Sequence, residues 1–236
     1  MEESRREASL RVDRPVTGVL RLALDRPERR NALDRPLLEG LLDAFDDPAE
    51  PVVVLGSTSP EAFCAGADLR LADAERAEVS DLLYALYERM TASRAIVVAA
   101  LPGPAVGGGA QLAIAADLRV AAPGARIQVA GPGHGLAVAA WGLPSLIGRG
   151  RAMDLCLTMR AVGAEEARAI GLVDRVADDA DAAAVELAAE LAVLDPAAAA
   201  RVKRVAWASA RALQALEMER VENRASWTGS MEVARG

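Results

Sequence analysis

The feature that most constrains this chain is a pair of apolar runs, each followed by a glycine-containing loop. PVVVLGS (51–57) precedes FCAGADL (63–69), and AIVVAAL (95–101) precedes PGPAVGGGAQLA (102–113). Short apolar runs bounded by turn residues are typical of strands that are covered on both faces. Ligands of parallel sheets bind beyond the carboxyl ends of the strands, so we expect both loops to lie at that functional edge.

The remaining pattern predicts alternating strands and helices. SLRV and GVLRLAL predict an N-terminal hairpin, and Asp34 is the expected N-cap of a helix that ends near Phe45. We also expect helices over residues 74–92 and 108–116 and a short strand over 118–122. This alternation predicts an α/β fold with a mainly parallel sheet.

The end of the chain has a different character. Beyond Gly150 the pattern predicts helices throughout. These helices are expected to begin near Arg151, Ala164, Asp181 and Pro196. We therefore expect a sheet-bearing core over residues 1–175 and a helical region over residues 176–236.

Composition excludes several functional classes. The net charge is −7 and the arginines are scattered along the chain, so the sequence lacks the clustered basic residues of a nucleic-acid-binding protein. The two cysteines, Cys64 and Cys156, lie far apart, so we expect no disulfide and no metal site, and a cytoplasmic location. MEESRREASL has no apolar run typical of a secretion signal. Residues 95–116 are uncharged, but their prolines and glycines favour a buried strand, loop and helix over a membrane span.

The three consecutive glycines, Gly107 to Gly109, need a reason, because glycine is costly in conformational entropy and supplies no side-chain packing. We infer that main-chain N–H groups approach a ligand closely where the next helix begins. The alternative is a tight corner between strand and helix without a ligand.

Four motifs in register resemble one family. LDRPERRNAL, FCAGADL, GPAVGGGAQLAIAADLRVA and GRGRAMDLCLTMRAVGAEEARAIGLVDRV occur in the order and spacing of the enoyl-CoA hydratase/isomerase family, the crotonase superfamily. The resemblance implies a ClpP/crotonase-type spiral of ββα units with a helical C-terminal trimerisation region. It also implies an acyl-CoA substrate, with coenzyme A as part of the substrate and no permanently bound cofactor.

The resemblance also implies roles for individual residues. The main-chain N–H groups of Ala67 and Gly108 correspond to the oxyanion hole that holds the thioester oxygen. The segment that the family uses near the adenine and phosphates of coenzyme A, together with the first glycine loop, contains Arg26, Arg29, Arg30, Ala65 and Asp68. A solvated basic turn is the alternative for the arginines, and Asp68 is equally a candidate helix cap.

The resemblance further implies a homotrimer or a dimer of trimers. In the helical end, apolar positions expected to pack on neighbouring subunits include Leu187, Leu191, Val202 and Leu213.

The chain departs from the family pattern at both catalytic carboxylates. Gln111 occupies the position of one glutamate, and no acidic residue occurs between Asp117 and Asp154, where the second is expected. An amide orients water but cannot carry its proton at neutral pH, so we do not expect efficient hydration. Gln111 either contacts the acyl group or a water, or satisfies its amide with nearby backbone.

His134, the single histidine, lies in the loop GPGHG that should line the acyl pocket. It is a candidate base in place of the missing glutamates; the alternative is a solvated loop histidine. The sequence therefore predicts an acyl-CoA enzyme that stabilises an enolate, with decarboxylation, isomerisation or weak hydration as its reaction. Two alternatives remain open: a thioester hydrolase with His134 as base, and an acyl-CoA-binding subunit without catalysis.

Overall fold

The main sheet is mixed and places both glycine loops at one edge. The computed structural model describes residues 5–7, 9–68, 73–209 and 212–226. Within them, seven strands pair in the order β1-β2-β3-β4-β5-β7-β10, antiparallel from β1 to β3 and parallel from β3 onward. These strands are β1 (Arg5–Glu7), β2 (Leu10–Asp13), β3 (Val19–Leu24), β4 (Val52–Ser57), β5 (Ile96–Leu101), β7 (Leu118–Ala121) and β10 (Arg175–Val176). The predicted hairpin is β2–β3, and β4 and β5 are the two strands that lead into the loops.

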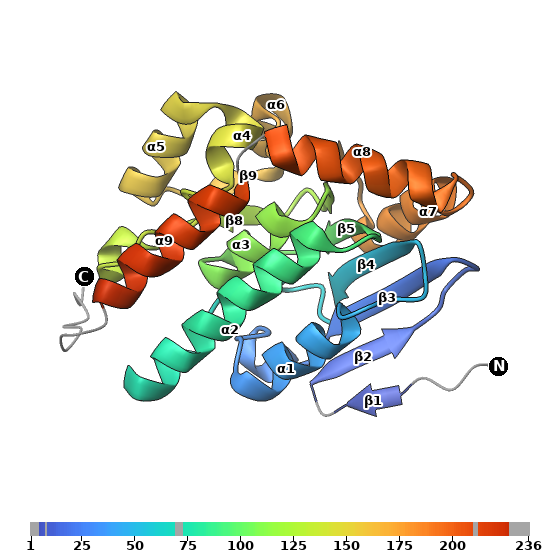
Figure 1. Ribbon diagram of the computed structural model, residues 1–236, viewed down its shortest axis with the longest axis horizontal. Coiled ribbons are helices and arrows are strands. Elements are labelled where there is room, and N and C mark those ends of the chain that lie inside the picture. Colours follow the sequence, from blue (N-terminus) through green and yellow to red (C-terminus); the bar gives the residue numbers. More distant parts are fainter. Residues whose placement is uncertain (1–4, 8, 69–72, 210–211, 227–236) are drawn as a thin grey trace.

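Helices cover both faces of this sheet (Figure 1). On one face, α1 (Arg35–Ala44), α2 (Asp73–Ala92) and α3 (Gly108–Ala115) pack on the strands, and α7 (Ala180–Ala192) covers the other. Alternate residues of β4 point to opposite sides: Val53 and Leu55 join the first core, Val52 and Val54 the second. The β4 and β5 runs are therefore apolar throughout because they are buried on both faces.

Helix α1 begins where its local sequence predicts. The Asp34 carboxylate accepts a hydrogen bond from the Leu37 N–H at 3.1 Å, and Pro36 occupies the first turn. This side-chain cap satisfies one of the N–H groups that the start of a helix leaves without a partner.

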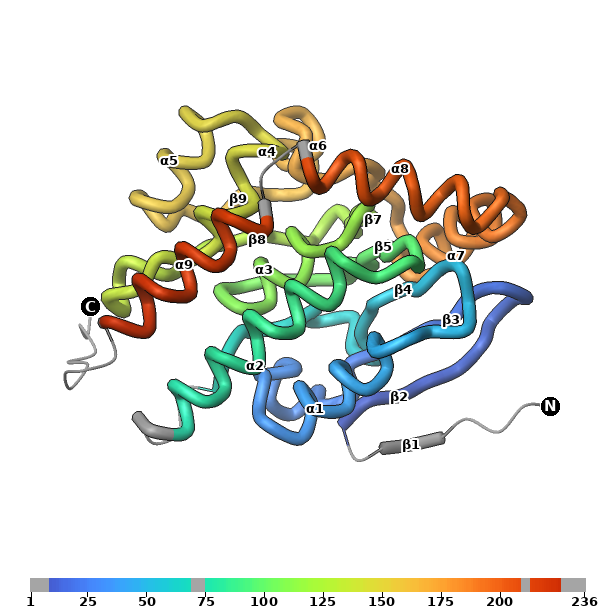
Figure 2. The backbone as a smooth tube through the Cα atoms, in the orientation of Figure 1, coloured from blue at the N-terminus to red at the C-terminus, as the bar shows by residue number. Residues whose placement is uncertain are grey.

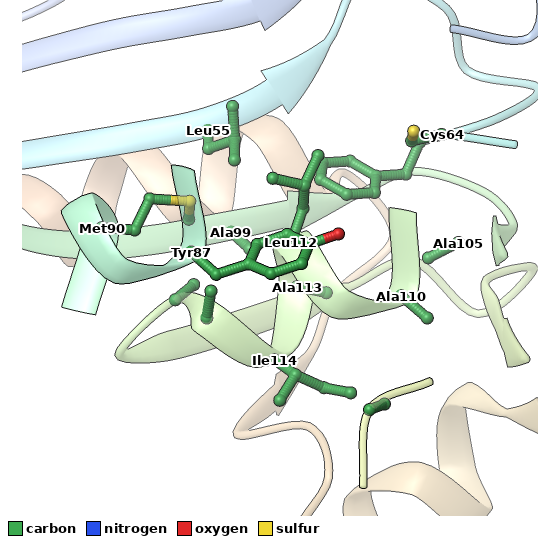
Figure 3. Close-up of a cluster of buried hydrophobic side chains, with 14 of the residues drawn as sticks. Leu55, Cys64, Tyr87, Met90, Ala99, Ala105, Ala110, Leu112, Ala113 and Ile114 are labelled. Atoms are coloured by element: carbon green, nitrogen blue, oxygen red, sulfur yellow. The ribbon is translucent and has the colours of Figure 1, made fainter. Parts of the chain in front are cut away.

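Helix α3 is the most deeply buried helix near the loops. Figure 3 shows Tyr87 of α2 lying against Leu112 and Ala113 of α3, with Leu55 of β4 above them. The Tyr87 hydroxyl donates to the Gly108 carbonyl at 3.2 Å, so α2 holds the start of α3 in place.

A second, smaller sheet lies beside the first, and the sequence did not predict it. Its strands are β6 (Ala105–Val106), β8 (Arg126–Gln128) and β9 (Val162–Gly163), in the order β6-β8-β9. The prediction of an entirely helical chain beyond Gly150 was therefore wrong at two places, because β9 and β10 are short strands that pair with earlier segments. Strands of two residues carry no periodic signal.

Four helices of the second half begin close to their expected positions: α5 (Arg149–Thr158), α6 (Ala164–Ile170), α7 and α8 (Pro196–Ser209). The sequence predicted neither α4 (Leu143–Ile147) nor a separate start for α9 (Ala212–Ser226). Leu187 is only 4% exposed and packs within the α7 core, which corrects the expectation that it faces a neighbouring subunit. Val202 and Leu213 are 72% and 46% exposed.

The last helices are attached by buried polar contacts. Lys203 of α8 is buried against Asp117, with 2.8 Å between Nζ and the carboxylate, and it also donates to the carbonyls of Met90 and Ala95. Asp117 in turn accepts a hydrogen bond from the Val97 N–H, so it fixes β5 as well. Helix α9 returns across the molecule to lie along α2 (Figure 2).

In the part of the chain that the structure describes, no helix combines the length and the apolar character needed to cross a bilayer. The apolar stretch 95–116 instead forms β5, the second glycine loop and α3, as expected.

Candidate active site

The two glycine loops are hydrogen-bonded to each other. The N–H groups of Phe63 and Cys64 donate to the Pro104 carbonyl at 3.0 and 3.2 Å, and the Val106 N–H donates to the Cys64 carbonyl at 2.9 Å. The loops after β4 and β5 thus lie side by side at the carboxyl edge of the sheet, as their positions in the sequence predicted. Burial raises the pKa of the Cys64 thiol to about 12, so this cysteine contributes packing rather than a nucleophile.

The close approach of the loops explains two of the glycines. A β carbon built on Gly109 would lie 2.3 Å from the Cys64 carbonyl oxygen, so a side chain does not fit there. Gly107 has φ of +53°, in the left-handed region that favours glycine. The corner between strand and helix therefore accounts for Gly107 and Gly109.

Gly66 brings the two loops together at a third point. It has φ of +89°, and a β carbon built on it would lie 3.2 Å from the Gly108 nitrogen. Since Ala67 follows Gly66 directly, the main-chain nitrogens of Ala67 and Gly108 both lie where the two loops meet.

Both of these N–H groups are available to a ligand. Among the described residues, neither the Ala67 N–H nor the Gly108 N–H donates to a protein acceptor. The segment at Leu33 bonds to the loop on either side of Ala67, through the Gly66 carbonyl at 2.8 Å and the Asp68 N–H at 3.0 Å. Gly108 opens α3, whose N-terminus carries a partial positive charge. Both groups therefore suit an oxygen with developing negative charge.

Asn31, a residue that the sequence analysis did not single out, supports the first loop. It is fully buried, with φ of +54°. Its amide nitrogen donates to the Ser57 hydroxyl at 2.8 Å and to the Phe63 carbonyl at 2.9 Å, and its oxygen accepts from the Arg26 N–H at 2.8 Å. The turn that contains Asn31 is thereby fastened to the end of β4 and to the loop.

A cavity of about 160 Å³ opens beside Ala67 and Gly108. Its wall is formed by the two loops, by α2, by the segment 130–138 and by α9. Side chains in this wall include Arg76, Tyr84, Gln111, His134, Leu136 and Asn223. Among the described residues of the wall none is a carboxylate, so the chemistry available there comes from main-chain N–H groups and a few polar side chains.

Gln111 lines the cavity, but its oxygen is already engaged. Oε1 accepts hydrogen bonds from the Ala139 N–H at 3.0 Å and from the Trp141 indole N–H at 2.9 Å. Both partners are donors, which fixes the oxygen on that side. Of the two interpretations offered by the sequence, bonding to nearby protein groups describes the oxygen.

His134 lies in the wall at the end of a short 3-10 helix (Pro132–His134). Its Nδ1 is buried and has no hydrogen-bonding partner among the described residues. The ring therefore lies at the cavity, as the sequence predicted for the loop.

The arginines of the 26–30 turn differ from one another. The Arg26 guanidinium bonds to the Asp34 carboxylate at 3.0 Å and to the Ala32 carbonyl, so this side chain holds its own turn. Arg29 and Arg30 are exposed. The Arg30 carbonyl accepts from the Ala65 N–H at 2.9 Å, which places this turn directly beside the first loop.

Asp68 and Ala65 complete the first loop. Ala65 lines the cavity and is exposed. The Asp68 main chain bonds to Leu33, while the expected role of its side chain as a helix cap involves residues 69–72, which lie outside the described residues.

A buried polar cluster behind the cavity was missed by the sequence analysis. Glu219 of α9 is 4% exposed and accepts hydrogen bonds from the Tyr84 hydroxyl at 2.9 Å and the Trp141 N–H at 3.0 Å. Asn223 donates to the Tyr84 oxygen at 2.8 Å. Burial raises the pKa of Glu219 to about 7, and its hydrogen bonds limit the rise. Nothing in the local sequence marks this glutamate, because α9 carries several others and only the fold buries this one.

Known proteins match the chain over nearly its whole length. The sequence profile of the family described as Enoyl-CoA hydratase/isomerase matches residues 15–229. The chain belongs to the enoyl-CoA hydratase/isomerase family. A Mycobacterium bovis relative bearing the name "Probable enoyl-CoA hydratase echA6" is 44% identical over 195 residues, which cover 80% of this chain and 78% of that protein. Enoyl-CoA isomerase/hydratase fer4 of Mycosarcoma maydis is 36% identical over 186 residues, 69% of this chain and 66% of that protein.

Solved structures confirm the crotonase fold. An enoyl-CoA hydratase/isomerase from Mycobacterium paratuberculosis superposes with a TM-score of 0.85 at 28% identity, covering 95% of each chain. An enoyl-CoA hydratase from Bacillus anthracis gives a TM-score of 0.81 at 27% identity, covering 93% of this chain and 90% of that one. This enoyl-CoA hydratase/isomerase family member thus has the fold that its four motifs predicted, and an acyl-CoA substrate agrees with its family.

Proposed function

We propose that this family member binds an acyl-CoA thioester in the cavity and stabilises its enolate with the main-chain N–H groups of Ala67 and Gly108. The observation that carries this proposal is that two N–H groups without an acceptor among the described residues lie at one cavity. Preorganised donors of this kind lower the barrier to forming an oxyanion, and the loss of one typically costs about 10²–10³ in rate.

The reaction we propose is decarboxylation or isomerisation, with hydration at most weak. Hydration needs one group to remove a proton from water and another to deliver one to carbon. Gln111 cannot carry a proton, and the wall of the cavity offers no carboxylate among the described residues. Loss of CO₂ generates an enolate without a base, so it makes the fewest demands on the side chains.

Acyl-CoA binding without turnover is the second candidate function. The engaged oxygen of Gln111 favours it, because this oxygen orders the segment at Ala139 and Trp141. Thioester hydrolysis with His134 as base is the third, supported by the buried, unpartnered Nδ1 in the cavity wall.

The coenzyme A part of the substrate has candidate contacts at the mouth of the first loop. Arg29 and Arg30 are exposed beside Ala65 and suit phosphate oxygens. Arg26 is a weaker candidate than the sequence implied, because its guanidinium already bonds to Asp34 and Ala32.

The assembly we propose is a homotrimer or a dimer of trimers. Support comes from exposed apolar side chains at the end of α7 and along α8, beside a groove of about 700 Å³. These side chains are Val193, Leu194, Val202 and Val205. Apolar patches of this kind are typical of protein interfaces.

A variant at Ala67 tests the main-chain donors. Ala67→Pro removes the N–H, while the bonds of the loop to Leu33 use the neighbouring Gly66 carbonyl and Asp68 N–H. Ala67→Ser is the matched control, since it retains the N–H. Mass spectrometry would follow acyl-CoA thioesters, including a 3-carboxyacyl-CoA and a 3-enoyl-CoA, and calorimetry would measure binding.

We expect turnover by the wild type and by Ala67→Ser, and turnover lower by about 10²–10³ in Ala67→Pro. Equal rates in a folded Ala67→Pro protein would contradict the proposed oxyanion hole. Binding of every thioester without any product would establish the second candidate function.

A further inference from the structure

The cluster behind the cavity has no part in the proposal above, although it brings a carboxylate next to the cavity wall. Tyr84 and Asn223 line the cavity, and they meet at the Tyr84 oxygen. Glu219 does not line it, but its carboxylate is 2.9 Å from that same oxygen. The hydroxyl of Tyr84 therefore connects the cavity to a buried acid.

We infer that Tyr84 is a catalytic acid–base at the α carbon of the bound thioester, and that Glu219 positions it and stores the proton. The inference rests on the proposed function, because it needs a thioester in the cavity. It identifies a source for the proton transfer that Gln111 cannot perform.

The proton balance of this relay closes within the three groups. In the forward direction the α C–H bond breaks, its proton passes to the Tyr84 oxygen, and the Tyr84 O–H proton passes to the Glu219 carboxylate. The electron pair of the C–H bond forms the enolate, whose oxygen is held by Ala67 and Gly108. In reverse, or after loss of CO₂, protonated Glu219 returns its proton through Tyr84 to the enolate carbon.

The surroundings of each group suit this role. Burial raises the pKa of Tyr84, and the nearby Glu219 carboxylate raises it further. The phenol therefore stays protonated and transfers protons without carrying a lasting charge. The pKa of Glu219 is raised only to about 7, because burial disfavours the ionised carboxylate while the hydrogen bonds from Tyr84 and Trp141 favour it. Asn223 fixes the Tyr84 oxygen from a third direction and is itself held by the Ala137 carbonyl at 2.6 Å.

Two further titratable groups that interact with Glu219 remain neutral near pH 7. Tyr87 of α2 and Cys156 of α5 both interact with Glu219, and burial raises the pKa of Tyr87 and brings that of Cys156 to about 11. His134 lies in the same cavity wall, so a His134→Gln variant is included to separate its contribution from that of Glu219.

Exchange of the α protons of butyryl-CoA in D₂O tests the relay without knowledge of the natural reaction. The variants are Glu219→Gln, which retains an acceptor for Tyr84 and Trp141 but cannot ionise, and Tyr84→Phe, which retains the ring. Glu217→Gln is the matched control, because Glu217 is exposed on the same helix. Calorimetry on each protein measures butyryl-CoA binding, and thermal melts confirm folding.

We expect the wild type and Glu217→Gln to exchange, with a rate that rises between about pH 6 and 8 as Glu219 loses its proton. Glu219→Gln and Tyr84→Phe should bind butyryl-CoA within a few-fold of the wild type but exchange about 10²-fold more slowly, without that rise. If Glu219→Gln does not fold, Tyr84→Phe carries the test alone.

Several results would overturn the relay. Wild-type exchange in Glu219→Gln or Tyr84→Phe would do so, as would a pH rise that survives in Glu219→Gln and disappears in His134→Gln. Binding without exchange in the wild type would also overturn it, while leaving acyl-CoA binding in place. Absence of butyryl-CoA binding by the wild type would contradict the proposed function itself, and the relay with it.

Discussion

Gln111 Oε1 lies 2.9 Å from the indole nitrogen of Trp141, on a segment that is 30 residues away in the chain. The same oxygen accepts from the Ala139 N–H, and Trp141 is stacked between Tyr87 and Trp207, with ring centroids 6.0 and 6.3 Å apart. Gln111 therefore joins the glycine helix α3 to the far wall of the cavity. Its oxygen supports the wall rather than a reaction.

Hydration is the first property that this contact predicts. The wild-type protein should hydrate crotonyl-CoA poorly, and Gln111→Glu should recover at most part of the activity. A glutamate there would bond to the same two donors, and no other described residue of the cavity wall is a carboxylate. Loss of the enoyl absorbance in a spectrophotometer measures the rate. Robust hydration by the unaltered chain would contradict this assignment of the site.

Asn31 is expected to matter for stability well beyond its size. Asn31→Ala removes the hydrogen bonds of a fully buried side chain and leaves a β carbon at φ of +54°, so we expect the free energy of unfolding to fall by about 2–4 kcal/mol. For Asn31→Gly we expect a loss of unfolding free energy that is about 1 kcal/mol smaller, since glycine tolerates that φ. Urea unfolding measures both, and a loss below about 1 kcal/mol in Asn31→Ala would contradict the role of this side chain.

Glu219 makes stability depend on pH. Its pKa is raised from 4.5 to about 7 on folding, so the native state binds more protons than the unfolded chain between these values. The free energy of unfolding should therefore fall as pH rises from about 5 to 8, by on the order of 3 kcal/mol from this group, and level off at higher pH. The free energy of unfolding of Glu219→Gln should lack this pH dependence, so the stability of the variant relative to the wild type should increase as pH rises.

Urea unfolding at fixed protein concentration between pH 5 and 8 checks this dependence. Glu217→Gln, on the exposed side of α9, should parallel the wild type. Parallel curves for Glu219→Gln and the wild type would show that Glu219 has an ordinary pKa in the folded protein.

Val202 tests the proposed assembly. Its side chain is 72% exposed beside the α7–α8 groove, so Val202→Asp should leave the fold intact while its charge disfavours burial against another subunit. Light scattering after gel filtration should show a smaller particle than the wild type. Val221→Asp, at an exposed position of α9, is the matched control, and an unchanged mass for Val202→Asp would exclude this face from the interface.

The sequence predicted those features whose signals are local. Asp34 and Pro36 mark the start of α1, and the two glycine loops follow strands that are apolar throughout. Their meeting required only the rule that parallel strands end at one edge of a sheet. The position of His134 at the cavity was predicted differently, from the resemblance of its loop to the corresponding loop of the family.

Other features depend on contacts between distant segments and left no local signal. The partners of Gln111 lie 28 and 30 residues away, and Tyr84 meets Glu219 and Asn223 across 135 and 139 residues. In a helix with many polar residues, the sequence pattern around a buried glutamate does not differ from that around an exposed one. Burial, which decides its chemistry, is a property of the assembled structure.

The two N–H groups that we propose bind the thioester oxygen, at positions 67 and 108, belong to the main chain, so thioester binding and catalytic activity need not be lost together. Ordinary substitutions change side chains and leave peptide nitrogens in place, so a pocket of this kind can lose every reactive carboxylate and still bind a thioester. Proteins built on this frame can therefore exchange one reaction for another, or keep only capture of the ligand, through a handful of changes in the walls.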